Sequence, residues 1–350
     1  MSKDYLNVEK DYPELLAHLM NIIISVEGQK AEEKYKLYAH GLAIKILRHC
    51  IEILNLYNVS EIIFESKTSY KFIDFSTINV LTRVVLEAFS TLYFVYCDDK
   101  DEIEFRYLVW QLGGYIERQG YSSEMEESKK KLEEEAKKII EIKEKIQSNI
   151  SFSKLPKALQ NRALNGDWKL GIKIPELVEK SGFNKEYVGK NYSFLCSYSH
   201  NSWSSVMQVY EGKSLKIQKD LSYPILQFSL MILANTIYWY SSLNKKSLET
   251  FEKDKYRFDC TIAWKNFGLY IKSCEAEVKE FIEDKLNLEE NTITSEITFE
   301  SLSLNNDGKA NLIKKFADKK KYDFNEFNIE EILKIEDFVK QYIIIRNKNT

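Results

Sequence analysis

The sequence is poor in turn-forming residues, with 12 glycines and 4 prolines in 350 residues. A β-sandwich or a glycine-rich α/β fold needs many more of them, so both are hard to build from this chain. The five cysteines are an odd number without CxxC spacing, which argues against a zinc ribbon and a complete disulfide set. The net charge of −3 creates no strong field for nucleic acid or an anionic membrane. The composition therefore favours a fold made mainly of long helices.

Targeting signals and familiar catalytic motifs are also missing. The first thirteen residues contain no apolar core of a secretory signal, so we expect a cytoplasmic protein. HExxH, GxxxxGK, GxGxxG and GxSxG patterns are absent from the sequence. His18, His40, His49 and His200 do not share the short helical spacing that lets imidazoles converge on a metal. We therefore expect neither a metal site nor a cofactor.

Long segments with helical spacing of apolar residues are present instead. The Glu- and Lys-rich segment 122–147 predicts a solvated helix that forms half of a helical hairpin. Helices are further predicted over residues 13–26, 35–57, 73–96, 102–118 and 187–210. The expected fold is all-α, a multi-helix bundle.

Segment 223–243 carries no formal charge and is long enough to span a bilayer. Polar side chains such as Gln227 and Asn235 are spread through it, and no second comparable segment stands out. Helices that are apolar nearly all round also occur in the cores of large helical proteins. We expect a buried central helix and no membrane span.

The pattern changes after residue 247. Residues 291–304 alternate apolar side chains such as Ile293, Ile297 and Phe299 with polar ones, the only clear strand periodicity in the chain. The tail beyond them returns to helical spacing. We infer a main helical domain over 1–247 and a C-terminal helical appendage over 248–350 with a short strand or hairpin.

Arg83 and Glu87 are the first candidate site residues. They lie four residues apart within an apolar helix, so their side chains share one face and can pair. Among such neighbours the pair is expected to be at least partly buried. It serves either as a structural ion pair between two helices or as part of a site.

The second candidate is the polar stretch 187–203, which ends in Tyr198, Ser199 and His200. An imidazole there can act as a general acid or base near neutral pH. On a helix His200 would also share a face with Cys196, which permits a thiolate–imidazolium pair. The simplest interpretation is a structural histidine at a helix contact.

Several parts of the chain carry a family resemblance, namely segments 79–87, 92–96, 104–107 and 187–200 and Trp168. They resemble an uncharacterised bacterial helical family, domain of unknown function 5677. The resemblance covers about residues 35–247. It implies an Arg-x3-Glu helix facing a segment that ends in histidine, and no established activity.

A more distant likeness is to the HEPN superfamily, whose ribonucleases cut RNA without metal. They use an arginine and a histidine separated by four to six residues. Residues 193–195, which leave this gap before His200, contain no arginine. The likeness therefore requires Arg83 or Arg106 to supply the guanidinium from elsewhere in the bundle.

Two functions follow. In the first, the chain is a binding, sensor or effector module of a bacterial stress or antiphage system, and it binds a protein partner or a second copy of itself. Alternatively it is a metal-independent ribonuclease acting on RNA, in which an arginine holds the phosphate and His200 moves the proton. An open cleft where the two motifs meet favours the second function, and a sealed core the first. The candidate catalytic residues are His200, Arg83, Glu87, Arg106, Tyr198 and Ser199.

Overall fold

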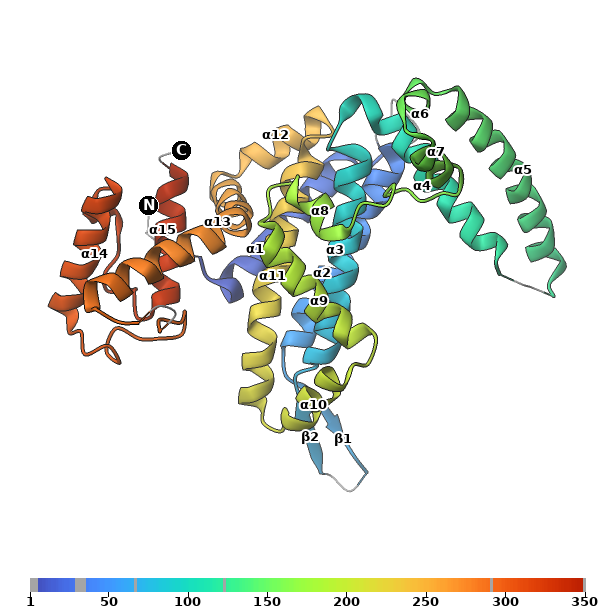
Figure 1. The fold of residues 1–350 in the computed structure, drawn as a ribbon. Helices are drawn as coiled ribbons and strands as arrows, with labels where there is room; N and C mark the ends of the chain where they lie inside the picture. The colour runs from blue at the N-terminus through green and yellow to red at the C-terminus, as the bar shows by residue number, and fades with distance from the viewer. Residues whose placement is uncertain (1–5, 29–35, 66–67, 122–123, 290–291, 349–350) are drawn as a thin grey trace.

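The computed structural model describes residues 6–28, 36–65, 68–121, 124–289 and 292–348. Fifteen α-helices and one two-stranded antiparallel sheet make up most of these ranges (Figure 1). The all-α prediction is confirmed.

Four long helices form the central bundle. They pack against one another through apolar faces, and α3 and α11 are the most deeply buried of the four. The first helix begins five residues before Pro13, because the Asn7 side chain accepts the backbone N–H of Lys10 and caps it there. The four helices are α1 (Val8–Val26), α2 (Lys36–Tyr57), α3 (Phe75–Tyr96) and α11 (Leu215–Ser241).

Two of these helices are long and apolar enough to cross a membrane. They are α3 and α11, so the expectation of a single such segment was wrong. In their most apolar windows 72% and 78% of the residues are buried within the fold, as in the core helices of soluble proteins. Neither helix is therefore a clear membrane span.

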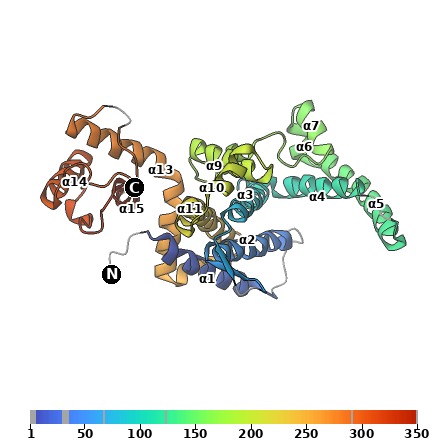
Figure 2. The ribbon, with the colours of Figure 1, turned by 90° about the horizontal axis from the view of Figure 1, so that it is seen from below.

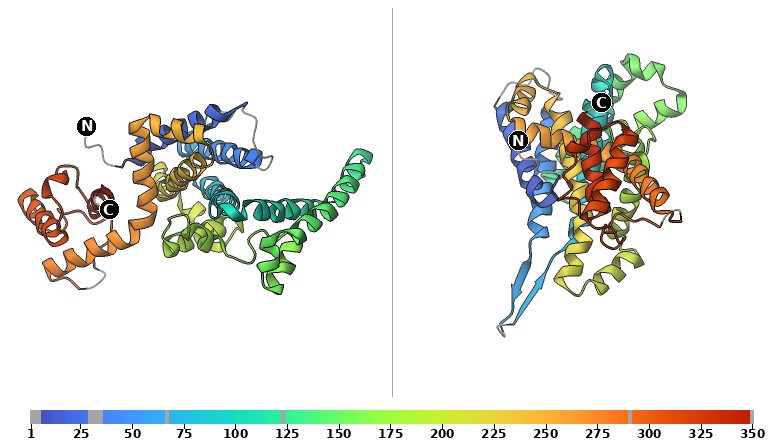
Figure 3. Two further views of the ribbon diagram at one scale, coloured as in Figure 1. Left: turned by 90° about the horizontal axis from the view of Figure 1, so that it is seen from above. Right: turned by 90° about the vertical axis from the view of Figure 1, so that its left-hand side faces the viewer.

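A helical hairpin projects from the central bundle (Figures 2 and 3). Its helices α4 (Ile103–Gln119) and α5 (Glu126–Ser148) pack against each other, and most of α5 is exposed, as predicted. Two short helices, α6 (Ile150–Lys154) and α7 (Lys157–Leu164), return along it.

Two glycines allow the backbone after α7 to touch α4. A Cβ atom on Gly113 would lie 2.4 Å from the carbonyl oxygen of Gly166, and Gly166 has a φ of 73°. Only glycine meets both demands without strain. The close backbone contact therefore fixes the base of the hairpin.

The predicted helix over 187–210 is broken into α9 (Lys185–Ser199) and α10 (Trp203–Glu211). Asn201 adopts a left-handed φ of 51°, which asparagine tolerates better than most residues. Ser202 then caps α10 by accepting the backbone N–H of Ser205. The prediction was wrong because it ran through this junction, and His200 lies at the end of α9. The short helix α8 (Ile174–Glu179) packs beside α9.

The C-terminal helices are reached through α13 (Lys255–Leu286). This helix packs on α1 and α11 and also on α14 (Asn306–Lys320) and α15 (Ile335–Lys348), as its course in Figure 2 shows. The preceding α12 (Lys245–Lys253) packs on α1 and α11. The division at residue 247 stays a prediction.

The predicted strand over 291–304 is reduced to one antiparallel bridge between Thr298 and Lys334, and residue 291 lies outside the described residues. The two-stranded sheet lies elsewhere. Strands β1 (Ser60–Ile63) and β2 (Ser69–Phe72) form a hairpin that projects from one end of the bundle (Figure 1). In β1 the apolar residues Ile62 and Ile63 are adjacent, so this strand shows no alternation of apolar and polar side chains.

His18 makes the stability of the bundle dependent on pH. Its ring is buried between α12 and α13, with Nδ1 3.2 Å from the Thr261 hydroxyl and Nε2 3.2 Å from the Phe251 carbonyl oxygen. Burial lowers the pKa of His18 from 6.5, although the Phe251 carbonyl opposes that shift. As the pH falls, His18 therefore takes up a proton in the unfolded chain before it does so in the folded protein. The folded state loses stability as the pH falls below about 6.5.

We expect the urea concentration at the unfolding midpoint to decrease when the pH is lowered from 7.5 to 5.5. This decrease should be smaller in His18→Gln. Burial also lowers the pKa values of His40 and His49, so some pH dependence should survive the substitution. Equal losses in the wild type and the variant would show that His18 does not carry the effect.

Candidate functional site

Helices α3 and α9 bring Arg83, Glu87 and His200 together. The Nε atom of Arg83 donates a hydrogen bond of 2.9 Å to Oε1 of Glu87, one turn along α3. Its Nη1 atom lies 3.4 Å from Nε2 of His200 at the end of α9. Guanidinium nitrogens only donate, so a hydrogen bond between these two atoms requires Nε2 to accept, with the ring proton on Nδ1.

Tyr192 completes this cluster. Its hydroxyl donates to Oε1 of Glu87 at 3.0 Å, and the Arg83 guanidinium lies 5.9 Å from the centre of its ring. Burial, together with the negative charge of Glu87, raises the pKa of Tyr192 to about 12, so it remains a donor. Sequence reasoning did not choose Tyr192 as a site residue. The spacing of four between Tyr192, Cys196 and His200, which places all three on one helix face, could have found it.

The cluster lies at the surface. The side chains of Arg83 and Glu87 are 22% and 40% exposed, and His200 is exposed. Burial by itself lowers the pKa of Arg83. The hydrogen bond to Glu87 and the negative charge of Glu87 have the larger combined effect and raise that pKa above its ordinary value. Because solvent screens so exposed a pair, we expect it to contribute less than about 1 kcal/mol to stability. The charges are accessible to a ligand.

Tyr198 and Ser199 make their contacts elsewhere. The Tyr198 hydroxyl donates to the side-chain oxygen of Gln208 on α10, and burial raises its pKa to about 12. The Ser199 hydroxyl donates to the backbone carbonyl of Leu195 at 3.4 Å. The Tyr198 hydroxyl therefore joins α9 to α10, whereas the Ser199 hydroxyl bonds within α9. The catalytic assignment of both residues stays a prediction.

Arg106 belongs to a different cluster. Its Nη1 atom donates to Asp98 at 2.8 Å and to the backbone carbonyl of Phe94 at 2.7 Å. The side chains of Arg106 and Asp98 are each 12% exposed, and the Phe94 ring lies against the guanidinium at 4.1 Å. Of the two arginines that the sequence offered, Arg83 is the one that meets His200.

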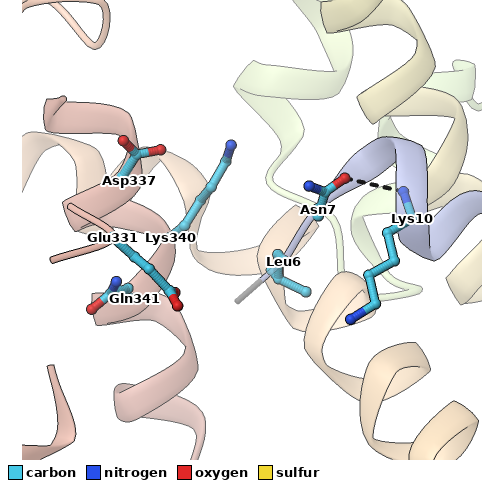
Figure 4. Close-up of a pocket in the computed structure, with 7 residues that line it drawn as sticks. All are labelled: Leu6, Asn7, Lys10, Glu331, Asp337, Lys340 and Gln341. Atoms are coloured by element: carbon cyan, nitrogen blue, oxygen red, sulfur yellow. Dashed lines mark hydrogen bonds between the residues drawn. The ribbon is translucent and has the colours of Figure 1, made fainter. Parts of the chain in front are cut away.

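Two surface cavities lie apart from this cluster. One of about 290 Å³ lies between the start of α1 and α15 (Figure 4), and one of about 280 Å³ lies near the base of the β1–β2 hairpin. Neither is lined by Arg83, Glu87 or His200. Within the described ranges, no three His, Cys, Asp or Glu side chains are grouped as metal ligands.

Residues 36–214 match the model of a family of unknown function, DUF5677. The match covers more than half of the chain and contains the whole Arg83–Glu87–His200 cluster. The chain belongs to the DUF5677 family. No curated protein and no solved structure matches it.

The DUF5677 region extends from α2 through α10 and ends at Ser214, the residue that caps α11. The match ends before residue 247, up to which the resemblance was expected to extend. Helices α1, α11 and α13, which pack together in this structure, contribute to the fold from outside the DUF5677 match.

Proposed function

We propose that the chain is an effector that cleaves RNA without a metal ion. The observation that carries this proposal is the contact of 3.4 Å between Nη1 of Arg83 and Nε2 of His200 at an exposed position. A fixed guanidinium beside an imidazole provides a cation for a phosphate and a group that moves a proton. Arginine binds phosphate particularly well because its N–H groups form a planar fork.

The cluster suits an attack by the ribose 2′-hydroxyl. Arg83 binds a non-bridging phosphate oxygen, and Glu87 and Tyr192 keep its guanidinium in place. Because hydrogen bonds to an anion are stronger than those to a neutral acceptor, Nη1 of Arg83 donates to the bound phosphate instead of the imidazole, which frees Nε2. His200 then takes the 2′-hydroxyl proton, and that oxygen attacks phosphorus. The bond to the 5′-oxygen breaks, water protonates this oxygen, and the other fragment ends in a 2′,3′-cyclic phosphate.

The distant likeness to HEPN ribonucleases implies an arginine and a histidine as well, but this chain departs from their pattern, because residues 193–195 contain no arginine. In this chain the two residues come from different helices and lie 117 positions apart. A bacterial stress or antiphage role in the cytoplasm fits such an activity and forms part of the proposal.

The test is incubation of the purified chain with a single-stranded RNA in excess chelator. We expect cleavage to persist and the fragments to carry 2′,3′-cyclic phosphate ends, which mass spectrometry identifies. Expression in bacteria should slow growth and shorten cellular RNA. Cleavage lost with chelator, or fragments with 3′-hydroxyl ends, would reject this mechanism.

The β1–β2 hairpin favours a second candidate function, a module that binds a protein partner or a second copy. Ile62, Ile63 and Tyr70 on this hairpin are 47%, 73% and 55% exposed. Exposed apolar strands with unpaired edges readily pair with another chain. A stable dimer in sedimentation experiments, together with absence of cleavage, would favour this function.

A further inference from the structure

Helix α10 carries an uncovered aromatic face directly beside His200. Trp203 follows His200 by three residues and is 78% exposed, and Tyr210 is 72% exposed. Val206, between them, is 56% exposed. Residues 203, 206 and 210 lie on one side of a helix, and the Cα atoms of Trp203 and Tyr210 are about 10 Å apart along its axis. We call these three side chains the α10 face.

The α10 face has no charge of its own, and charges of both signs flank it, with Glu211 directly after Tyr210 and Lys213 beyond it. No Asp, Glu, Lys or Arg occurs from Trp203 to Tyr210. The Lys213 ammonium lies 4.7 Å from the centre of the Tyr210 ring, and Arg83 and His200 are at the other end of the helix. Large aromatic side chains exposed in this way usually mark a binding surface.

We infer that the α10 face binds unpaired bases of single-stranded RNA beside the phosphate site. This inference rests on the proposed function. Every base has a flat face that stacks on tryptophan or tyrosine, whereas the bases of a duplex are already stacked and their faces are hidden. A strand whose phosphate contacts Arg83 lies within reach of Trp203, because only two residues separate Trp203 from His200. The substrate class is therefore single-stranded RNA.

The experiment measures binding separately from cleavage. A fluorescently labelled 12-nucleotide RNA with 2′-O-methyl groups cannot be cut by 2′-hydroxyl attack, so anisotropy reports its Kd. Removing an aromatic ring on which a base stacks weakens binding by about 5- to 150-fold. We expect Trp203→Ala to weaken binding by such a factor and Trp203→Phe to retain most of it. A duplex of the same sequence should bind the wild type more weakly than the single strand.

Tyr121 is the matched control, because it is 62% exposed but lies at the far end of the α4–α5 hairpin. Tyr121→Ala should leave the Kd unchanged. No binding of the single strand, equal binding of strand and duplex, or unchanged binding in Trp203→Ala would overturn the inference. A dimer that Trp203→Ala dissociates would also overturn it, because a second copy would then cover the α10 face.

The same measurements separate this inference from the proposed function. Trp203-dependent binding by a wild type that cuts no RNA would reject the ribonuclease and keep the base-binding face. Cleavage with an unchanged KM in Trp203→Ala would keep the ribonuclease and reject the face.

Discussion

Replacing His200 with alanine should slow RNA cleavage by about 10²- to 10⁴-fold, the usual contribution of a general acid or base. Its exposed ring contributes little to packing, so we expect the melting temperature to change by about 2 °C or less. Single-turnover cleavage and thermal unfolding, measured on the same sample, check both parts. A large fall in melting temperature would instead indicate a structural histidine.

Variants of Arg83 sharpen this test. Arg83→Lys keeps a positive charge but loses the planar fork that binds a phosphate at two points, so it should recover only part of the activity lost in Arg83→Ala. His49, a histidine on α2, is the matched control, and His49→Ala should cleave at the wild-type rate. Wild-type cleavage by His200→Ala would contradict the mechanism.

Local patterns in the sequence predicted the helices that position this site. Helix α2 was predicted to within one residue of its start and α3 to within two, because long runs of helical spacing are hard to confuse with other structure. The hydrogen bond between Arg83 and Glu87 follows from the same regularity, since residues four apart always face each other on a helix.

The choice between Arg83 and Arg106 could not be made from the sequence. Both lie on apolar helices, and which one meets His200 depends on how α3 packs against α9 across 117 residues of chain. The α9–α10 junction was missed for a related reason, because Asn201 is compatible with a helix interior. Its left-handed conformation shows only in the folded backbone.

The contact between Trp264 and Asp11 also escaped prediction, although it joins the first helix to α13. Trp264 is fully buried, and its indole Nε1 donates a hydrogen bond of 2.8 Å to Oδ2 of Asp11. Burial raises the pKa of Asp11, and the hydrogen bond from Trp264 limits this rise. The residues lie 253 positions apart, so no local pattern relates them.

Trp264→Ala should therefore destabilise the fold strongly. Truncating a buried tryptophan costs about 3–5 kcal/mol. Oδ2 of Asp11 also loses one donor and keeps the backbone N–H of Asn7 at 2.9 Å. The cost of the truncation is a large part of the stability of an ordinary domain. Chemical denaturation at neutral pH measures it, and Trp264→Phe, which keeps most of the ring volume but removes the donor, isolates the hydrogen bond.

Trp203 provides a control with the same chemical change. Its side chain is 78% exposed, whereas that of Trp264 is fully buried, so the two substitutions remove identical atoms from opposite environments. Trp203→Ala should change the unfolding free energy by no more than about 0.5 kcal/mol. Similar losses in the two variants would mean that Trp264 on α13 is not packed against α1. A large loss confined to Trp264→Ala would locate the stabilising contact there and leave Trp203 free to act in binding.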